Sequence, residues 1–198
     1  MHATREEMRA HDAQALGGRL EVTTMKSKGW SHVGLGTWDI ERTREFYEGV
    51  LGFKAVRCDI IKVKEGGEVH HVFFDTGRGQ LLAFMELRGV PGVPARLDMN
   101  LNRVFSIPGA FHVYHFALEA GDEAELMAKR TELIAKGVKV SPIVDHEWAK
   151  SIYFRDPNGV VIEYSFLTRE FTEDDGRIQA RFEVSLDDPL PWTDFRAQ

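Results

Sequence analysis

The chain has 198 residues, with 25 Lys and Arg against 31 Asp and Glu, which gives a formal net charge of −6 with neutral histidine. This acidic balance argues against a nucleic-acid or anionic-membrane surface and favours a small-molecule substrate. Cys58 is the only cysteine, which excludes an internal disulfide and suits a reducing cytoplasm. No apolar run is long enough to span a bilayer, and the N-terminus has no apolar segment typical of a signal peptide.

One central domain is expected between two terminal extensions. The N-terminal extension contains a charged segment of helical composition, residues 5–16. The predicted divisions are an N-terminal extension (1–29), a single domain (30–167) made of module one (30–88), a linker (89–110) and module two (111–167), and a C-terminal tail (168–198).

The first module has the order β-α-β-β-β. Apolar residues recur at helical spacing over 40–50, with Asp39 as the expected N-cap and Gly52 just beyond the helix. Strand composition bounded by Gly-rich turns predicts the four strands at 31–37, 53–61, 68–74 and 80–87.

The same order returns in the second module. A helix is predicted over 122–136, with an acidic first turn and Gly137 after its end. The predicted strands are 111–119, 138–143, 151–154 and 160–166, the last two joined by the turn 156–159.

An internal repeat follows from this order. Aligning the two copies pairs His32 with His115 and Phe73 with Tyr153, and it places Ala83 at the position of Glu163. Two such modules can curl their sheets together into a half-open barrel, so we predict an α+β fold around one concave site.

Glu163 lies in an apolar strand, where a carboxylate is costly unless it is paired, protonated or bound to a metal. A single Glu of this kind is more often a solvent-facing residue, but His32 and His115 fall on equivalent strands of the repeat. Two imidazoles and one carboxylate form the facial triad of non-haem Fe(II) oxygenases, which leaves coordination positions open. We therefore predict a metal site of His32, His115 and Glu163.

Strand alternation sorts the remaining histidines. His71 shares a face with Phe73, whereas His70 and His112 point to the opposite faces of their strands and are interpreted as structural or surface residues. Phe73, Phe84 and Trp148 are candidates for an apolar pocket wall, although aromatic residues on strands more often pack in the core.

The second module carries a longer motif: Val144-Asp145-His146, then Ile152-Tyr153, then Asp156-Pro157-Asn158-Gly159, and finally Glu163. This motif resembles the signature of type I extradiol ring-cleavage dioxygenases. Residues 30–167 resemble their wider family, the vicinal oxygen chelate superfamily, which also contains glyoxalase I, fosfomycin-resistance enzymes and bleomycin-binding proteins. The resemblance implies paired β-α-β-β-β modules, the three metal ligands named above, and a homodimer.

Carried over from the resemblance, His146 and Tyr153 would act by hydrogen bonding near the substrate, one as a proton shuttle and the other as an O–H donor. Two positions depart from the family pattern. Ala83 replaces a fourth ligand that glyoxalase I commonly has, and residues 102–105 contain no histidine where the dioxygenases usually have their base. His71 or His146 would have to serve instead.

Three functions follow from the resemblance. The first is a dioxygenase that cleaves a catechol-like or vicinal-diol aromatic with Fe(II) or Mn(II). The second is a glyoxalase-like isomerase or lyase with Zn or Ni, and the third is a small-molecule-binding protein without catalysis. A fosfomycin-type transferase fits less well, because no cationic side chains stand beside the expected metal.

Overall fold

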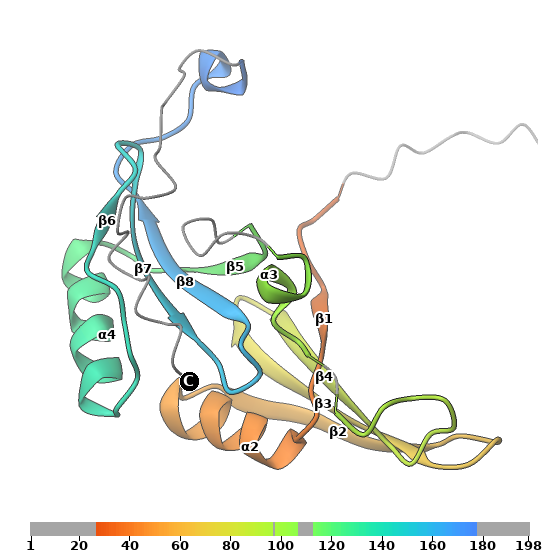
Figure 1. Ribbon diagram of the computed structural model, residues 1–198. Coiled ribbons are helices and arrows are strands. Elements are labelled where there is room, and N and C mark those ends of the chain that lie inside the picture. Colours follow the sequence, from red (N-terminus) through yellow and green to blue (C-terminus); the bar gives the residue numbers. More distant parts are fainter. Residues whose placement is uncertain (1–26, 97, 107–112, 178–198) are drawn as a thin grey trace, which may run out of the picture.

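The computed structural model describes residues 27–96, 98–106 and 113–177 (Figure 1). They form two four-stranded sheets, sheet A with the order β1-β4-β3-β2 and sheet B with the order β5-β8-β7-β6. In each sheet the first strand of the module pairs parallel to the last, and the other pairings are antiparallel. The predicted α+β fold of two tandem, open modules is confirmed. The expected helix at 5–16 and His112 lie outside the described residues.

The first module follows the predicted order. Its strands are β1 (His32–Gly36), β2 (Lys54–Lys62), β3 (Glu68–Gly77) and β4 (Gln80–Arg88). The helix begins as α2 (Ile40–Arg44) and continues as a π-helix, η1 (Glu45–Val50). Asp39 caps α2, because its Oδ1 accepts a hydrogen bond from the backbone N–H of Arg42 at 2.9 Å.

The second module repeats this order after a short helix in the linker, α3 (Leu101–Val104). Its elements are β5 (His115–Glu119), α4 (Glu123–Ala135), β6 (Val144–Asp145), β7 (Ala149–Arg155) and β8 (Val161–Leu167), followed by a 3₁₀ turn, η2 (Glu173–Gly176). Within the described residues, no helix has both the length and the apolar character needed to cross a membrane.

The strand predicted at 138–143 is wrong, because regular pairing begins only at Val144. Ser141 instead binds β7 at one residue, Tyr153. Its Oγ accepts a hydrogen bond from the backbone N–H of Tyr153 at 3.0 Å, and its own backbone N–H donates to the Tyr153 carbonyl at 2.9 Å. Pro142 follows and has no N–H to continue a ladder.

The two sheets have the same internal register, which confirms the alignment of the repeat. In sheet A, Ala83 lies opposite Phe73 on one side and Gly34 on the other. In sheet B, Glu163 lies opposite Tyr153 and Ala117. The first strands also match, since His32 pairs with Leu81 and His115 with Val161.

Contacts between the modules follow a pseudo-twofold pattern. Thr37, just after β1, donates to Asn158 in the β7–β8 turn at 2.7 Å. The equivalent contact joins Arg78 in the β3–β4 turn to Glu119 at the end of β5, at 2.7 Å. The end of each first strand therefore meets the hairpin turn of the other module.

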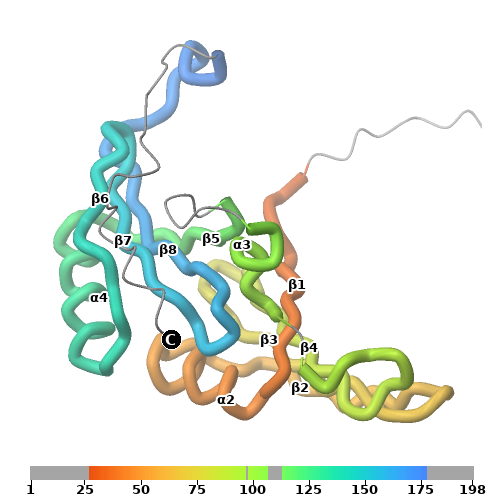
Figure 2. The backbone as a smooth tube through the Cα atoms, viewed as in Figure 1, coloured from red at the N-terminus to blue at the C-terminus, as the bar shows by residue number. Residues whose placement is uncertain are grey.

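The larger hydrophobic cluster of the described residues contains side chains from both modules. Tyr47 of η1 is fully buried against Phe74 and Phe84 of sheet A, and Phe46 contacts Phe154 of sheet B at a centroid distance of 6.4 Å. Figure 1 shows α4 along one face of sheet B and α2 near the lower end of sheet A, where the two modules approach. The smooth tube in Figure 2 shows the long β2–β3 hairpin extending away from this centre.

Candidate functional site

The site is best formed on sheet B, around Glu163. This carboxylate is 7% exposed, and its Oε2 lies 3.0 Å from Nε2 of His115 on the neighbouring strand β5. Its other oxygen accepts a hydrogen bond from Oγ of Ser151 at 2.5 Å. Strand pairing brings these three residues together, because β8 lies between β5 and β7.

Glu163 is held as a carboxylate by these donors. Burial raises its pKa, but the hydrogen bonds from His115 and Ser151 outweigh burial and place the pKa below the ordinary value. A buried carboxylate next to an imidazole is therefore available as a ligand or as an acceptor at neutral pH.

Tyr153 and His146 extend the site. Nε2 of His146 lies 2.9 Å from the Tyr153 hydroxyl, which also faces Glu163. Burial is the main cause that raises the pKa of Tyr153 well above its ordinary value, and the negative charge of Glu163 raises it further. The Tyr153 hydroxyl therefore keeps its proton and can donate it in a hydrogen bond.

An aromatic group adjoins His146 on the outer side of the site. The Trp148 ring lies 6.0 Å from the His146 ring and 5.3 Å from Phe171, which follows β8. Both Trp148 and Phe171 are about half exposed, so an apolar surface reaches solvent beside His146.

His115 and Glu163 supply two donor atoms of the kind that divalent metal ions bind. Metal–nitrogen and metal–oxygen bonds of about 2.1 Å at right angles place two neighbouring donors about 3 Å apart. The His115 nitrogen and the Glu163 oxygen have this separation, and Ser151 fixes the second carboxylate oxygen, as groups around a metal ligand commonly do.

His32, the third predicted ligand, lies on the other sheet. Its Nδ1 is 3.1 Å from Ser31 Oγ, and its ring contacts Phe73 edge-on at 5.7 Å. Among the described residues, no three His, Cys, Asp or Glu side chains are close enough together to hold a metal ion. The structure thus assembles His115 with Glu163 and leaves His32 outside that cluster.

His71 belongs to the His32 side of the site. Its ring contacts that of Phe73 at a centroid distance of 4.2 Å, tilted by 51°, on the face that strand alternation predicted. Burial lowers its pKa, an effect that the nearby Asp59 carboxylate opposes and His32 reinforces. The lowered pKa favours the neutral form of His71 on sheet A, whereas His146 and Tyr153 lie beside Glu163 on sheet B.

Phe84 does not line a site. It is fully buried on the opposite face of β4 and packs against Tyr47 and Phe74, because its neighbour Ala83 takes the site-facing position. Its prediction as a pocket residue is wrong for this reason. The alternation of side chains along the strand would have separated Phe84 from Ala83.

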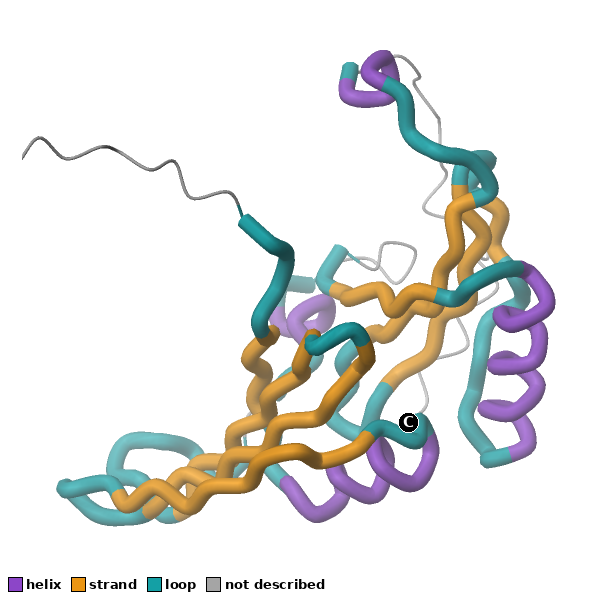
Figure 3. Tube along the Cα trace, turned by 180° about the vertical axis from the view of Figure 1, so that it is seen from behind, coloured by secondary structure: helices purple, strands orange, loops and turns teal. Residues whose placement is uncertain are grey.

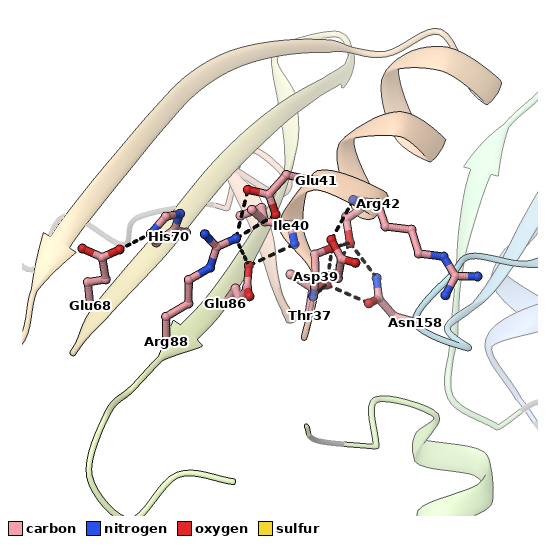
Figure 4. Close-up of polar contacts among 11 residues, drawn as sticks. Thr37, Asp39, Ile40, Glu41, Arg42, Glu68, His70, Glu86, Arg88 and Asn158 are labelled. Atoms are coloured by element: carbon pink, nitrogen blue, oxygen red, sulfur yellow. Dashed lines mark hydrogen bonds and ion pairs between the residues drawn. The ribbon is translucent and has the colours of Figure 1, made fainter. Parts of the chain in front are cut away.

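Glu86 and His70 make polar contacts with residues other than those around Glu163 (Figure 4). Glu86 Oε2 accepts from the backbone N–H of Ile40 at 3.0 Å and from Arg88 at 2.7 Å, so it holds the start of α2. His70 lies 2.5 Å from Glu68. The interpretation of His70 as a structural residue agrees with this pairing.

Two residues of the site have no counterpart among the sequence predictions. Ser151 lies two residues before Tyr153 and therefore on the same face of β7. The alternation of side chains along the strand could have identified Ser151 as a site residue. Asn102 is buried, and its side-chain amide donates to the Tyr114 carbonyl at 2.9 Å and accepts from the Tyr114 N–H at 3.0 Å. No sequence pattern indicated this contact beside His115.

Comparison with known proteins gives a relative in Bacillus subtilis (strain 168), named "Putative ring-cleaving dioxygenase MhqA". It is 27% identical over 141 residues, which cover 69% of this chain and 40% of the relative. The chain thus spans less than half the length of this curated relative.

Solved structures share the fold. An integron cassette protein, HFX_CASS4, from the mobile metagenome of the Halifax Harbour sewage outfall matches with a TM-score of 0.50 and 25% identity, over 71% of this chain and 100% of that chain. TnmS3, an antibiotic-binding protein from Streptomyces sp. CB03234, matches with a TM-score of 0.50 and 20% identity, over 73% and 99% of the two chains.

The family model described as "Glyoxalase/Bleomycin resistance protein/Dioxygenase superfamily" matches residues 29–164, which include both modules and the His115–Glu163 pair. The chain belongs to this superfamily.

Proposed function

We propose that the protein is a metal-dependent dioxygenase that cleaves the ring of a catechol-like aromatic next to its diol. The observation that carries the proposal is the continuous contact from His115 through Glu163 and Tyr153 to His146. It combines two metal-type donors with a protonated hydroxyl and an imidazole. The similarity to a ring-cleaving relative supports the same reaction class.

In this proposal His115, Glu163 and His32 would hold Fe(II) or Mn(II). The ion supplies chelation of the two substrate oxygens and activation of dioxygen. Tyr153 donates a hydrogen bond to negative charge on the substrate side, and His146 exchanges a proton through the Tyr153 hydroxyl. A homodimer and a cytoplasmic location are parts of the same proposal.

The test is anaerobic loading with Fe(II), followed by oxygen uptake with a panel of catechols and detection of the ring-opened product. His115→Gln and Glu163→Gln are expected to abolish uptake and to weaken metal binding, measured separately by calorimetry. Ser151→Ala is expected to weaken metal affinity about tenfold, because it removes the donor that orients Glu163.

Matched controls come from outside the site. His70→Gln and Glu132→Gln change the same residue types elsewhere and are expected to leave uptake and metal affinity unchanged. Metal binding without oxygen uptake would contradict the dioxygenase and point to a Zn- or Ni-dependent isomerase or lyase. Absence of metal binding would leave a small-molecule-binding protein.

A further inference from the structure

Strand β2 forms an outer edge of sheet A, so one side of its backbone pairs with β3 and the other faces outward (Figure 3). An edge strand presents a row of N–H and C=O groups to which another strand can bind. Three apolar side chains are exposed here: Val56 (48%), Ile60 (63%) and Ile61 (50%). Exposed Ile and Val on an edge strand favour pairing with a second strand over contact with water.

The central part of β2, Val56-Arg57-Cys58-Asp59-Ile60, is complementary to itself when read in opposite directions. If two copies pair antiparallel with Cys58 opposite Cys58, then Arg57 lies opposite Asp59 of the second copy. Each charged pair occurs twice because the contact is symmetric.

Neighbouring registers lack this complementarity. A shift by one residue in either direction places Arg57 opposite Ile60, or Asp59 opposite Val56. A shift that centres the pair on Arg57 or on Asp59 places like charges opposite each other, which is unfavourable. Among these registers, only the one centred on Cys58 places opposite charges across the pair.

We propose that two copies of this chain associate through β2, antiparallel and centred on Cys58, so that the two copies of sheet A become one continuous sheet. The Arg57 and Asp59 side chains already pair within one copy, with Nε 2.7 Å from Oδ2, and in the dimer they form a cluster of four alternating charges. This inference assigns a surface to the homodimer that the proposed function includes, and its observations come from β2 and not from the residues around Glu163.

The ends of β2 limit the length of the contact. In the proposed register Lys54 faces Lys62 of the second copy, and like charges oppose a longer ladder. The register of β2 against β3 also shifts between Ala55 and Arg57, which interrupts the strand at Val56. A short ladder predicts a dimer that dissociates on dilution, and its two-fold symmetry closes the assembly at two copies.

Cys58 makes the test specific, because it is exposed and is the only cysteine of the chain. Directly opposed residues of antiparallel strands have Cα atoms about 4.5–5.5 Å apart, which is within disulfide range. Mild oxidation of the full chain should therefore give a covalent dimer on non-reducing gels. Sedimentation of the reduced protein over a range of concentrations should show a monomer–dimer equilibrium.

Charge reversal tests the register. Asp59→Arg places arginines opposite each other and is expected to weaken association about tenfold or more and to suppress the cross-link. The double change Arg57→Asp with Asp59→Arg should restore both. Glu65→Arg, in the exposed turn between β2 and β3, is the matched control and should change neither.

Two outcomes would overturn the proposal. One is a monomer at all concentrations, with no cross-link from the wild-type chain. The other is a dimer that persists in Asp59→Arg, because association would then use another surface. Circular dichroism of each variant separates loss of association from loss of folding.

Discussion

At the scale of single residues, the site depends on side chains that hold the backbone in place as well as on the side chains of His115 and Glu163. Asn102 is 7% exposed and binds both backbone groups of Tyr114, directly before His115. A buried amide with both of its groups paired to one residue sets the position where β5 begins. Asn102 thereby positions His115 relative to Glu163.

Replacing Asn102 with Leu keeps the size of the side chain but leaves the N–H and C=O of Tyr114 without these partners. We expect a loss of about 2 kcal/mol in the free energy of unfolding, because two hydrogen bonds of about 1 kcal/mol each are lost. Urea denaturation measures it. Val104→Ala, at a half-exposed position of the same helix, should change stability by less than about 0.5 kcal/mol. Equal effects of the two changes would contradict this role.

The residues that sequence reasoning placed correctly are those whose position in a strand determines their face. His71 and Phe73 share a face as alternation requires, and the repeat aligned Ala83 with Glu163. Asn102 could not be predicted, because its contact with Tyr114 joins the short helix α3 of the linker to the residue before β5 and depends on how the chain folds back between them. Periodicity carries no information about such a contact.

At the scale of elements, the β7–β8 turn reverses the chain and also contacts the first module. Asp156 accepts the backbone N–H groups of Asn158 and Val160, each at 2.8 Å, which closes the turn. Asn158 then reaches Thr37 and Thr43 of the first module. The Asp-Pro-Asn-Gly part of the motif therefore serves as a contact between modules as well as a turn.

Gly159 and Gly79 occupy equivalent turns and allow a matched comparison. Both have positive φ angles, 84° and 73°, but a Cβ on Gly159 would lie 3.0 Å from the Cβ of Asn100, whereas a Cβ on Gly79 would meet nothing within 4 Å. We expect Gly79→Ala to cost about 1 kcal/mol from backbone strain and Gly159→Ala to cost at least about 1 kcal/mol more. Thermal and urea unfolding measure the difference. Equal costs would show that Asn100 moves freely aside.

Sequence patterns predict the regular form and the boundaries of an element less well than its presence. The helix predicted over 40–50 is present, but its second half is a π-helix. The wider turn allows the adjacent residues Phe46 and Tyr47 both to be buried, which a regular spacing of apolar residues does not specify. The strand expected at 138–143 failed because tertiary contacts of Ser141 replaced regular pairing.

At the scale of the whole molecule, the repeat predicted two modules but not how they meet. Sequence similarity between the copies indicates that they fold alike, whereas their packing depends on contacts between unlike residues. The two pseudo-equivalent contacts differ in kind: Thr37 with Asn158 is a buried polar contact, and Arg78 with Glu119 is an exposed ion pair. Exposed ion pairs contribute little, so the buried network at Asn158 is the main polar connection between the modules.

Asp156 makes this connection dependent on pH. It is buried, and Tyr47 donates to its Oδ2 at 3.2 Å while Asn158 donates at 2.9 Å. Burial raises its pKa, and the hydrogen bonds from Asn158, Val160 and Tyr47 oppose that rise without cancelling it. A carboxyl whose pKa is higher in the folded than in the unfolded state gives its full stabilisation below the unfolded value, about 4. That stabilisation is lost as the pH rises through the folded value.

The Asp156→Asn variant isolates this effect, because an amide does not titrate. Its NH₂ group faces the Asn158 amide donor, so the variant carries a cost that is independent of pH. We expect the stability advantage of the wild type over Asp156→Asn to be largest near pH 4 and to decline toward neutral pH. Urea unfolding of both proteins from pH 4 to 8 measures the difference. Tyr47→Phe removes one donor, so the decline should extend to higher pH in that background. An advantage that grows with pH would mean that the donors outweigh burial, and that the modules are joined by a stabilised carboxylate.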